Sequence, residues 1–264
     1  MKKKLLLIAS VLLTATAGAQ TIDIHKADGT TVSYPASEVN YIGFTAKQEG
    51  GSEEPSTPGT APAGAVAVDL GLPSGTKWAN MNVGASKPED YGLFFAWGET
   101  VGYGSDTNDG HFFGWQNYKW CNGSEDTMTK YCTDSSYGTV DNKTVLDLED
   151  DAAYVNWGSS WRMPTIAEIV ELLNNTTHVW TTQNGVSGRK FTSKTNGNSI
   201  FLPAAGECIG SAPDFQASRG HYWSSSLYVS YLDGALYLFF FSEHAGSAYD
   251  FRYHGYSVRP VLRN

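Results

Sequence analysis

Apolar residues recur with helical spacing in one segment of the chain. Four of them fall on one face of a helix and are expected to be buried: Ile166, Ile169, Val170 and Leu173. Thr165 and Glu168 have the spacing of a capping box at the start of this helix. Glu168 and Glu171 are then expected on the opposite face, in solvent. The pattern therefore predicts a helix from about Ile166 to Leu173.

A second helix is predicted for Asp147 to Trp157, because the acidic residues at its start suit the positive end of a helix dipole. Elsewhere, short apolar runs lie between turns rich in Gly, Ser and Asn, which is typical of short strands. Two main helices with short strands and long loops predict an α+β fold. Residues 66–264 have a suitable length for one such domain.

The region before this domain divides into two pieces. Ile22 and Ile24 alternate with polar residues, Asp28-Gly29 is a strong turn signal, and the alternation resumes afterwards, so residues 20–45 are predicted to be a small β-hairpin module. A piece of this length cannot bury a core alone, and we expect it to dock or to bind a surface-anchoring partner. Residues 46–65 are rich in Gly, Ser, Glu, Pro and Thr, which indicates a flexible linker.

The first nineteen residues have the pattern of a secretory signal peptide. Three lysines after Met1 precede an apolar run from Leu5 to Leu13, and Ala17-Gly18-Ala19 provides a small-residue cleavage site. The apolar run is too short to span a bilayer permanently, so no membrane insertion is expected after cleavage. The mature chain is predicted to start at Gln20 and to be periplasmic, displayed at the cell surface or secreted.

The charge balance limits the partners of the exported chain. Loss of the three leader lysines changes the net charge from −9 to about −12. Such an acidic chain is a poor partner for nucleic acid or an anionic membrane. Three cysteines are present, Cys121, Cys132 and Cys208. In an oxidising compartment Cys121 and Cys132 are the more suitable pair, while the alternative is that all three are buried free thiols.

The most informative pattern lies near the C-terminus. In the run Leu236 to Phe241, alternate residues share a face of a strand, so Tyr237, Phe239 and Phe241 lie together opposite three other apolar residues. We expect the face with Tyr237 to be an aromatic row in solvent, because a strand buried on both faces would leave many tyrosine hydroxyls to satisfy. Burial of both faces is the alternative.

Seven tyrosines lie between Tyr222 and Tyr256 among Ser, Gly, Asp and His, a composition found in antibody paratopes. The candidate ligand-binding residues are Tyr228, Tyr231, Tyr237, Phe239, Phe241, His244, Tyr249, Tyr253, His254 and Tyr256.

Several ordered motifs carry a resemblance to a known family. They are Val68-Asp69-Leu70-Gly71-Leu72-Pro73-Ser74-Gly75-Thr76-Lys77-Trp78, Phe95-Ala96-Trp97-Gly98-Glu99, Trp161-Arg162-Met163-Pro164-Thr165, Tyr222-Trp223-Ser224-Ser225-Ser226 and Ser257-Val258-Arg259-Pro260-Val261. With them the chain resembles the Fibrobacter and Bacteroides major-paralogous-domain family of secreted proteins over nearly all of residues 66–262. The resemblance implies a C-type-lectin-like core, related in fold to formylglycine-generating enzymes.

The tryptophans in these motifs are interpreted as core residues beside tight turns. We expect Arg162 and Arg259 to pair with buried carboxylates or carbonyls rather than with ligand, because an unpaired buried charge is costly.

The segment from Leu227 to Tyr256 has an unusual composition. Of Lys, Gln, Glu, Met and Trp, the residues that codons ending in a pyrimidine cannot encode, it contains only Glu243. In this it resembles the variable region of target proteins of diversity-generating retroelements, which commonly have C-type-lectin-like folds. Drift within a tyrosine-rich family gives the same composition, and both explanations make the segment a surface that faces ligand.

Catalytic and metal motifs are weak by comparison. Ser224 to Ser226 lie near His221, but no nucleophile-elbow motif is present. The oxygenase relatives with this fold use paired cysteines near the C-terminus, where this chain has only Cys208. The acidic cluster Asp147, Glu149, Asp150 and Asp151 is interpreted as a helix start. We expect no cofactor, and calcium, which some lectin-type relatives bind through loop carboxylates and Asn, has no supporting motif here.

Three hypotheses follow. The first is an adhesin-like recognition protein that binds an extracellular protein or glycan ligand. The second is a carbohydrate-binding accessory module of a polysaccharide-capture system. The third is an enzyme whose site has no recognisable motif.

Overall fold

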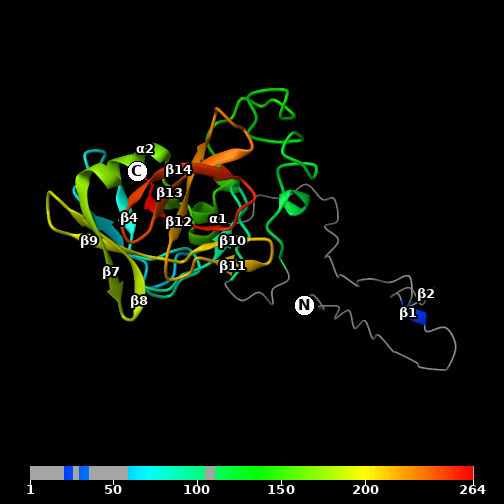
Figure 1. The fold of residues 1–264 in the computed structure, drawn as a ribbon, viewed down its shortest axis with the longest axis horizontal. Coiled ribbons are helices and arrows are strands. Elements are labelled where there is room, and N and C mark those ends of the chain that lie inside the picture. The colour runs from blue at the N-terminus through cyan, green and yellow to red at the C-terminus, as the bar shows by residue number, and fades with distance from the viewer. Residues whose placement is uncertain (1–20, 26–29, 36–58, 105–110, 264) are drawn as a thin grey trace, which may run out of the picture. The chain divides into compact units, whose positions relative to one another are not determined.

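A computed structural model describes residues 21–25, 30–35, 59–104 and 111–263 of the chain. The chain divides into two compact units, Met1–Glu53 and Glu54–Asn264, which are described separately (Figure 1). In the first unit, strand β1 (Thr21–His25) pairs antiparallel with β2 (Thr31–Pro35), with Ile22 opposite Tyr34. This confirms the predicted hairpin pairing. The signal peptide, the Asp28-Gly29 turn and most of the linker lie outside the described residues.

The second unit is mainly β, with two α-helices among the described residues, so the predicted mixture of helices and short strands is confirmed with strands dominating. Its helices are α1 (Ala152–Trp157) and α2 (Ile166–Asn175). Its strands are β3 (Ala67–Asp69), β4 (Lys77–Ala79), β5 (Phe94–Phe95), β6 (Trp161–Arg162), β7 (Thr176–Gln183), β8 (Val186–Ser193), β9 (Ser199–Pro203), β10 (Glu207–Ile209), β11 (Ala212–Asp214), β12 (Gly220–Leu227), β13 (Gly234–Phe240), β14 (Ala245–Phe251), β15 (Tyr256–Ser257) and β16 (Val261–Leu262).

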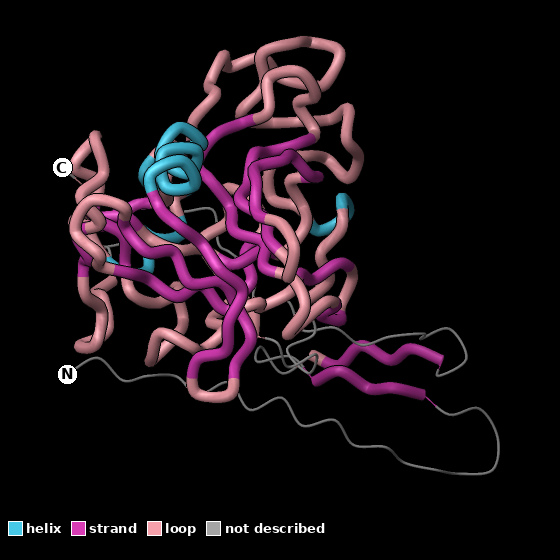
Figure 2. The backbone as a smooth tube through the Cα atoms, turned by 60° about the vertical axis from the view of Figure 1, so that its left-hand side comes forward, coloured by secondary structure: helices cyan, strands magenta, loops and turns pink. Residues whose placement is uncertain are grey.

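The strands of this unit form several open sheets. The largest has the order β14-β13-β12-β15-β5, and a second has the order β3-β4-β16-β6. The three strands β7, β8 and β9 form a meander, and β10 pairs with β11. Because β16 lies between β4 and β6, the end of the chain is hydrogen-bonded to the beginning of the domain. Long loops, which Figure 2 draws in pink, make up much of this unit, including most of the described chain between β5 and α1.

The folded unit begins earlier than Val66. The Gly59 amide donates to the Val155 carbonyl at 2.7 Å, and the Ala61 amide donates to the Trp157 carbonyl at 3.0 Å. The last part of the segment predicted to be a linker is therefore hydrogen-bonded to α1.

Helix α2 starts with the predicted capping box. The Thr165 hydroxyl accepts from the Glu168 amide, and the Glu168 carboxylate accepts from the Thr165 amide at 2.8 Å. The buried face of the helix is rotated from the predicted one, because Ile169 and Leu172 are fully buried whereas Val170 is 40% exposed. Burial of Val170 was therefore a wrong prediction. A ten-residue helix on a sheet buries a narrow stripe, and the stripe centred on Ile169 and Leu172 leaves Val170 on its solvent side.

Glu168 is not in solvent either. Its carboxylate receives two hydrogen bonds of 2.7 Å from the Arg162 guanidinium and one of 2.8 Å from the Thr76 hydroxyl. This bidentate ion pair confirms that Arg162 pairs with a partly buried carboxylate. The buried Arg259 guanidinium donates to the carbonyls of Ala79 and Phe201, as expected for a core arginine.

The other predicted helix is shorter than the pattern suggested. A 3-10 turn spans Leu148–Asp150, and α1 begins only at Ala152. Asp151 is the N-cap residue, since its carboxylate accepts hydrogen bonds from the amides of Ala153 and Tyr154. The acidic start of the helix thus caps it, as interpreted from the sequence.

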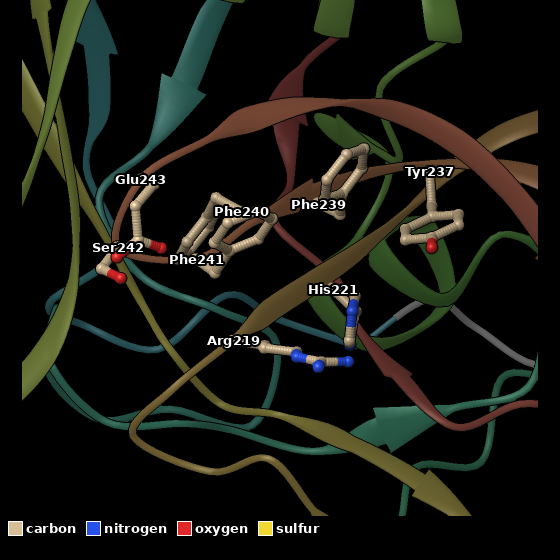
Figure 3. A pocket seen from close by; sticks show the side chains of 8 residues that line it. All are labelled: Arg219, His221, Tyr237, Phe239, Phe240, Phe241, Ser242 and Glu243. Carbon is tan, nitrogen blue, oxygen red and sulfur yellow. The ribbon is translucent and has the colours of Figure 1, made fainter.

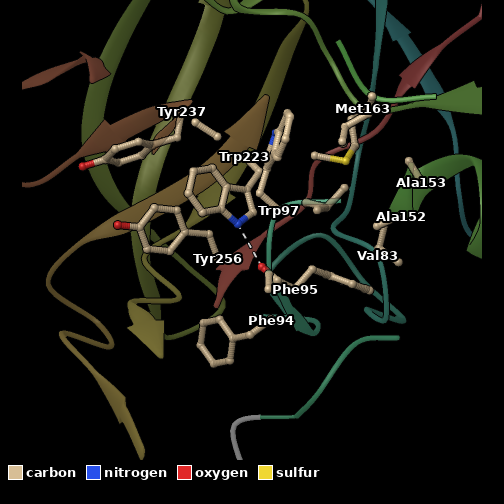
Figure 4. Close-up of a cluster of buried hydrophobic side chains, with 14 of the residues drawn as sticks. Val83, Phe94, Phe95, Trp97, Ala152, Ala153, Met163, Trp223, Tyr237 and Tyr256 are labelled. Atoms are coloured by element: carbon tan, nitrogen blue, oxygen red, sulfur yellow. Dashed lines mark hydrogen bonds between the residues drawn. The ribbon is translucent and has the colours of Figure 1, made fainter. Parts of the chain in front are cut away.

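The strands β12 and β13 separate two hydrophobic cores. On one side, Trp223 stacks on Tyr256 with ring centroids 4.3 Å apart, and its indole NH donates to the Phe95 carbonyl at 2.8 Å (Figure 4). On the other side, Leu238 and Phe240 are fully buried in the core that also contains α2 residues Ile169 and Leu172. Strand β13 is therefore covered on both faces over most of its length.

The three cysteines, all within the described residues, form no disulfide with one another, and the burial of two of them agrees with the second of the two alternatives. Cys132 and Cys208 are buried, and Cys121 is half-buried. The Cys121 thiol donates to the Trp115 carbonyl and the Cys132 thiol to the Asp134 carbonyl, so these two sulfurs have separate partners.

Candidate functional site

Three of the candidate tyrosines form a stack on the surface of the second unit. The rings of Tyr228 and Tyr249 lie 4.0 Å apart at 18°, and those of Tyr231 and Tyr249 lie 5.8 Å apart at 16°. Tyr231 is 51% exposed and Tyr249 is 46% exposed. We name this group, Tyr228, Tyr231 and Tyr249, the tyrosine stack. Its nearly parallel rings present flat apolar surface to solvent with few rotatable bonds.

A second aromatic group continues from the end of β14. The Phe251 ring stacks on the Tyr253 ring at 5.7 Å, and the Trp115 indole meets Tyr253 edge-on at 4.7 Å. We name Trp115, Phe251 and Tyr253 the indole cluster. Phe251 is 39% exposed. The sequence analysis selected neither Trp115 nor Phe251. Trp115 is distant in sequence, whereas Phe251 could have been found, because it has the same alternation as the selected Tyr249 and Tyr253.

A hollow of about 400 Å³ lies between the two groups. Its lining comprises Tyr231 and Tyr249 of the tyrosine stack, Phe251 of the indole cluster, and Asp233, Gly234 and Asp250. Burial raises the pKa of the Asp233 carboxyl above its usual value. A side chain at Gly234 would place its Cβ 3.1 Å from the Tyr249 ring, so glycine allows this ring to lie close to the strand. The hollow combines flat rings with a carboxylate acceptor.

Three of the candidate residues are not on the surface. Tyr237 is 8% exposed, His254 is 6% exposed and Tyr256 is fully buried, so the prediction that they project to solvent is wrong. The reason is the sheet register. Tyr237 lies opposite Trp223, and their shared face is covered by the core that contains Phe94 and Trp97 (Figure 4).

The remaining candidates form a separate group at the end of β13. The Phe239 and Phe241 rings are half-buried, and exposed His244 lies 5.4 Å from Phe239 and 5.9 Å from Phe241. Phe239 and Phe241 line a second hollow of about 420 Å³. Figure 3 shows Arg219 and His221 on one side of it and the aromatic residues of β13 on the other. The predicted aromatic row is therefore divided, with a buried tyrosine and two partly exposed phenylalanines.

A buried polar cluster lies beneath these surfaces. The Tyr256 hydroxyl donates to the Asp250 carboxylate at 2.7 Å, and His254 Nδ1 lies 3.3 Å from the other Asp250 oxygen. His221 Nδ1 lies 3.6 Å from a Glu207 oxygen. Burial lowers the pKa of His221 to about 4 and raises the pKa of Glu207. No spacing in the sequence pointed to Glu207 or His221 as partners of Asp250, because they come from three different strands.

The acidic cluster near α1 has a structural role. The Lys130 ammonium lies 2.6 Å from both the Asp147 and the Asp150 carboxylates, and it is 3.7 Å from Glu149. A lysine therefore occupies the centre of this cluster, where a cation would otherwise bind.

The serine run is also engaged in the fold. The Ser224 hydroxyl donates to the Leu236 carbonyl at 2.6 Å, and the Ser226 hydroxyl accepts from the Ile166 amide at 3.1 Å. The Ser225 hydroxyl donates to the Pro164 carbonyl at 3.3 Å. The Ser224 contact joins β12 to β13, and the contacts of Ser225 and Ser226 join β12 to the start of α2.

No protein-family model, no curated protein and no solved structure matches this chain. Within the described ranges, no helix combines the length and the apolar character that crossing a membrane requires.

Proposed function

We propose that this protein is an exported, adhesin-like recognition protein that binds an extracellular protein or glycan. Its binding surface consists of the tyrosine stack, the indole cluster and the hollow between them. The observation that carries the proposal is the stacking of three tyrosine rings, two of them about half exposed, beside a hollow that contains a carboxylate. Rigid amphipathic rings gain contact area at little cost in conformational entropy.

The proposal includes the finer fold and family. We infer a C-type-lectin-like domain of the major-paralogous-domain kind, and the motifs from Val68 to Val261 support it. The two helices, short strands and long loops agree with what that resemblance implies. The leader sequence supports export, and the acidic charge supports a partner other than nucleic acid.

The contacts of the serine run favour a binding protein over an enzyme that uses one of these serines as a nucleophile. The hydroxyls of Ser224, Ser225 and Ser226 are each engaged in contacts that join elements of the fold. A nucleophile needs instead an adjacent base that is positioned by a third group.

The hollow favours one further candidate, a carbohydrate-binding accessory module. Sugars present an apolar face for stacking on aromatic rings and hydroxyls for a carboxylate acceptor, and the hollow offers both, in Tyr249 and Asp233. Its volume of about 400 Å³ falls in the range of small-ligand sites. In this case the ligands would be related glycans, with no protein among them.

The test compares wild type with Tyr231→Ala/Tyr249→Ala on a glycan array and on a panel of host and bacterial surface proteins. Because both side chains are about half exposed, the double variant should fold normally and lose more than about 2 kcal/mol of binding free energy. Val179→Ala, an exposed residue of β7, is the matched control and should bind like wild type. Equal binding by the double variant would reject this surface as the site.

A further inference from the structure

Two carboxylates and an imidazole converge in the interior beside the end of β14. Glu207 comes from β10, Asp250 from β14 and His254 from the turn that follows. One ligand atom of each residue lies within 4.8 Å of those of the other two. Glu207 and His254 are more than nine-tenths buried, and Asp250 is half-buried. Residues with this donor chemistry rarely meet in a protein interior unless they are paired or hold a cation.

A fourth side chain points to a missing partner. His221 is 7% exposed, and its Nδ1 makes no hydrogen bond with any part of the chain that the structure describes. The same atom lies 3.6 Å from a Glu207 carboxylate oxygen. A buried polar atom without a partner is unusual enough to require a cause.

We propose that Glu207, His221, Asp250 and His254 bind a divalent transition metal of the zinc class. Glu207, Asp250 and His254 already lie together, whereas His221 lies beside Glu207 but outside that group of three, and it would move inward to complete the site. Two imidazole nitrogens and two carboxylate oxygens are a set that Zn²⁺ accepts in tetrahedral geometry. Calcium is a poor match, because it prefers six to eight oxygen ligands. The Tyr256 hydroxyl donates to one Asp250 oxygen at 2.7 Å and the Phe251 amide donates to the other at 2.8 Å, so both bonds orient this carboxylate. The oxygen that accepts from Phe251 has a second lone pair with which it would bind the metal.

The metal explains features that internal pairing leaves open. A proton on His254 Nδ1 could be shared with Asp250, whose oxygen lies 3.3 Å away. This pairing leaves the Glu207 carboxylate without an opposite charge and the His221 nitrogen without a hydrogen-bond partner. A doubly charged metal balances both carboxylates and gives the His221 nitrogen a partner. On binding, each imidazole would coordinate through an unprotonated ring nitrogen and keep its proton on the other nitrogen, and any proton held by a carboxyl would be released to solvent.

The site would join four separate parts of the chain next to the binding surface. Asp250 directly precedes Phe251, and His254 directly follows Tyr253, so a bound metal would fix both ends of the segment that carries the indole cluster. This inference rests on the buried cluster and stands independently of which ligand the aromatic surface binds.

The test uses the untagged full chain, stripped of metal with EDTA and titrated with Zn²⁺ by isothermal calorimetry. We expect one site per chain, a rise in Tm on binding, and an X-ray absorption spectrum with nitrogen and oxygen neighbours only. Glu207→Gln and His254→Gln should each weaken binding at least tenfold, and Tyr256→Phe should weaken it by about tenfold through loss of the supporting hydrogen bond.

Two controls separate this site from others on the chain. Glu149→Gln alters the lysine-filled acidic cluster, and Cys208→Ser removes the thiol next to Glu207, which points to the opposite side of β10. Both should bind Zn²⁺ like wild type. Absence of saturable binding by wild type, a sulfur neighbour in the spectrum, or unchanged affinity in folded Glu207→Gln would each overturn the proposal. The wild-type measurements decide the question even where a variant fails to fold.

Discussion

Arg252 lies in the tyrosine-rich segment from Leu227 to Tyr256, which we call the aromatic segment, but its side chain belongs to the core. Its guanidinium is fully buried and donates to the carbonyls of Tyr131, Leu232 and Lys130 and to the Tyr118 hydroxyl. The planar fork of an arginine guanidinium has five N–H donors, whereas a lysine ammonium has three, and here the guanidinium reaches four separate acceptors. Arg252 therefore connects the end of β14 to the long loop before α1.

Glu168 is the residue whose protonation should have the clearest effect on stability. Its burial opposes ionisation, but the hydrogen bonds from Arg162, Thr165 and Thr76 outweigh it and lower the pKa from about 4.5 to about 2. A depressed carboxyl pKa stabilises the fold at pH values above 4.5, and this contribution is lost as the pH falls towards 2. We predict that Glu168→Gln is less stable than wild type at pH 7 and that the difference shrinks between pH 4.5 and pH 2. Urea unfolding of both proteins at each pH measures it, and a constant difference would contradict the assignment.

At the scale of elements, α2 provides a direct test of which face packs on the sheet. Leu172 is fully buried, so Leu172→Ala should reduce the free energy of unfolding by about 2–5 kcal/mol. Val170→Ala on the neighbouring exposed position should change it by no more than about 0.5 kcal/mol. Denaturant unfolding measures both, and equal effects of the two substitutions would show that the helix is rotated from the position described.

Strand β13 illustrates why its pattern did not reveal its surroundings. The alternation correctly separated Leu238 and Phe240 from Tyr237 and Phe239, which the register places on opposite faces. It could not show that the loops after β5 cover the face with Tyr237, because those loops are distant in sequence. The tyrosine hydroxyls that seemed to require solvent are satisfied in the interior, as the Tyr256 hydroxyl is by Asp250.

At the scale of the whole molecule, the aromatic segment contributes residues both to the buried core and to the exposed surface. Leu232, Leu238 and Arg252 are buried, whereas Tyr231 and Tyr249 are exposed. If the gene is diversified by a retroelement, we predict that substitutions among natural copies concentrate at exposed positions such as Tyr231, Tyr249 and Phe251. Substitutions at the buried positions would be removed by selection, because they disrupt close packing and destabilise the fold. Sequencing the locus and its surroundings checks this. An even spread of substitutions, or no reverse transcriptase gene nearby, would exclude diversification.

The leader and the linker predict where the mature chain starts and where proteases cut it. The leader pattern predicts a secreted product that starts at Gln20, which N-terminal sequencing measures. The composition of residues 46–65 predicts ready cleavage by proteases, and the hydrogen bonds of Gly59 and Ala61 restrict the cuts to positions before Gly59. A limited digest should therefore leave a resistant fragment that begins near Gly59. Cleavage between Gly59 and Val66 under native conditions would contradict the described start of the domain.

The sequence by itself determined the features that depend on neighbouring residues. The Thr165–Glu168 capping box, the pairing of β1 with β2 and the acidic cap of α1 could be predicted because hydrogen bonds between residues close in the chain define them. The three members of the tyrosine stack could be selected as candidates because they belong to one segment rich in tyrosine.

Only the tertiary structure decided which of these residues reach solvent and which meet. Burial of Tyr237 and Tyr256 depends on a core contributed by residues more than a hundred positions earlier, such as Phe95 and Trp97. Trp115 joins Tyr253 across a similar separation. Glu207, His221 and Asp250 come from three strands that do not follow one another in a sheet, and only the tertiary fold brings their side chains near one another. Alternation along a strand assigns side chains to two faces, but the rest of the chain determines what covers each face.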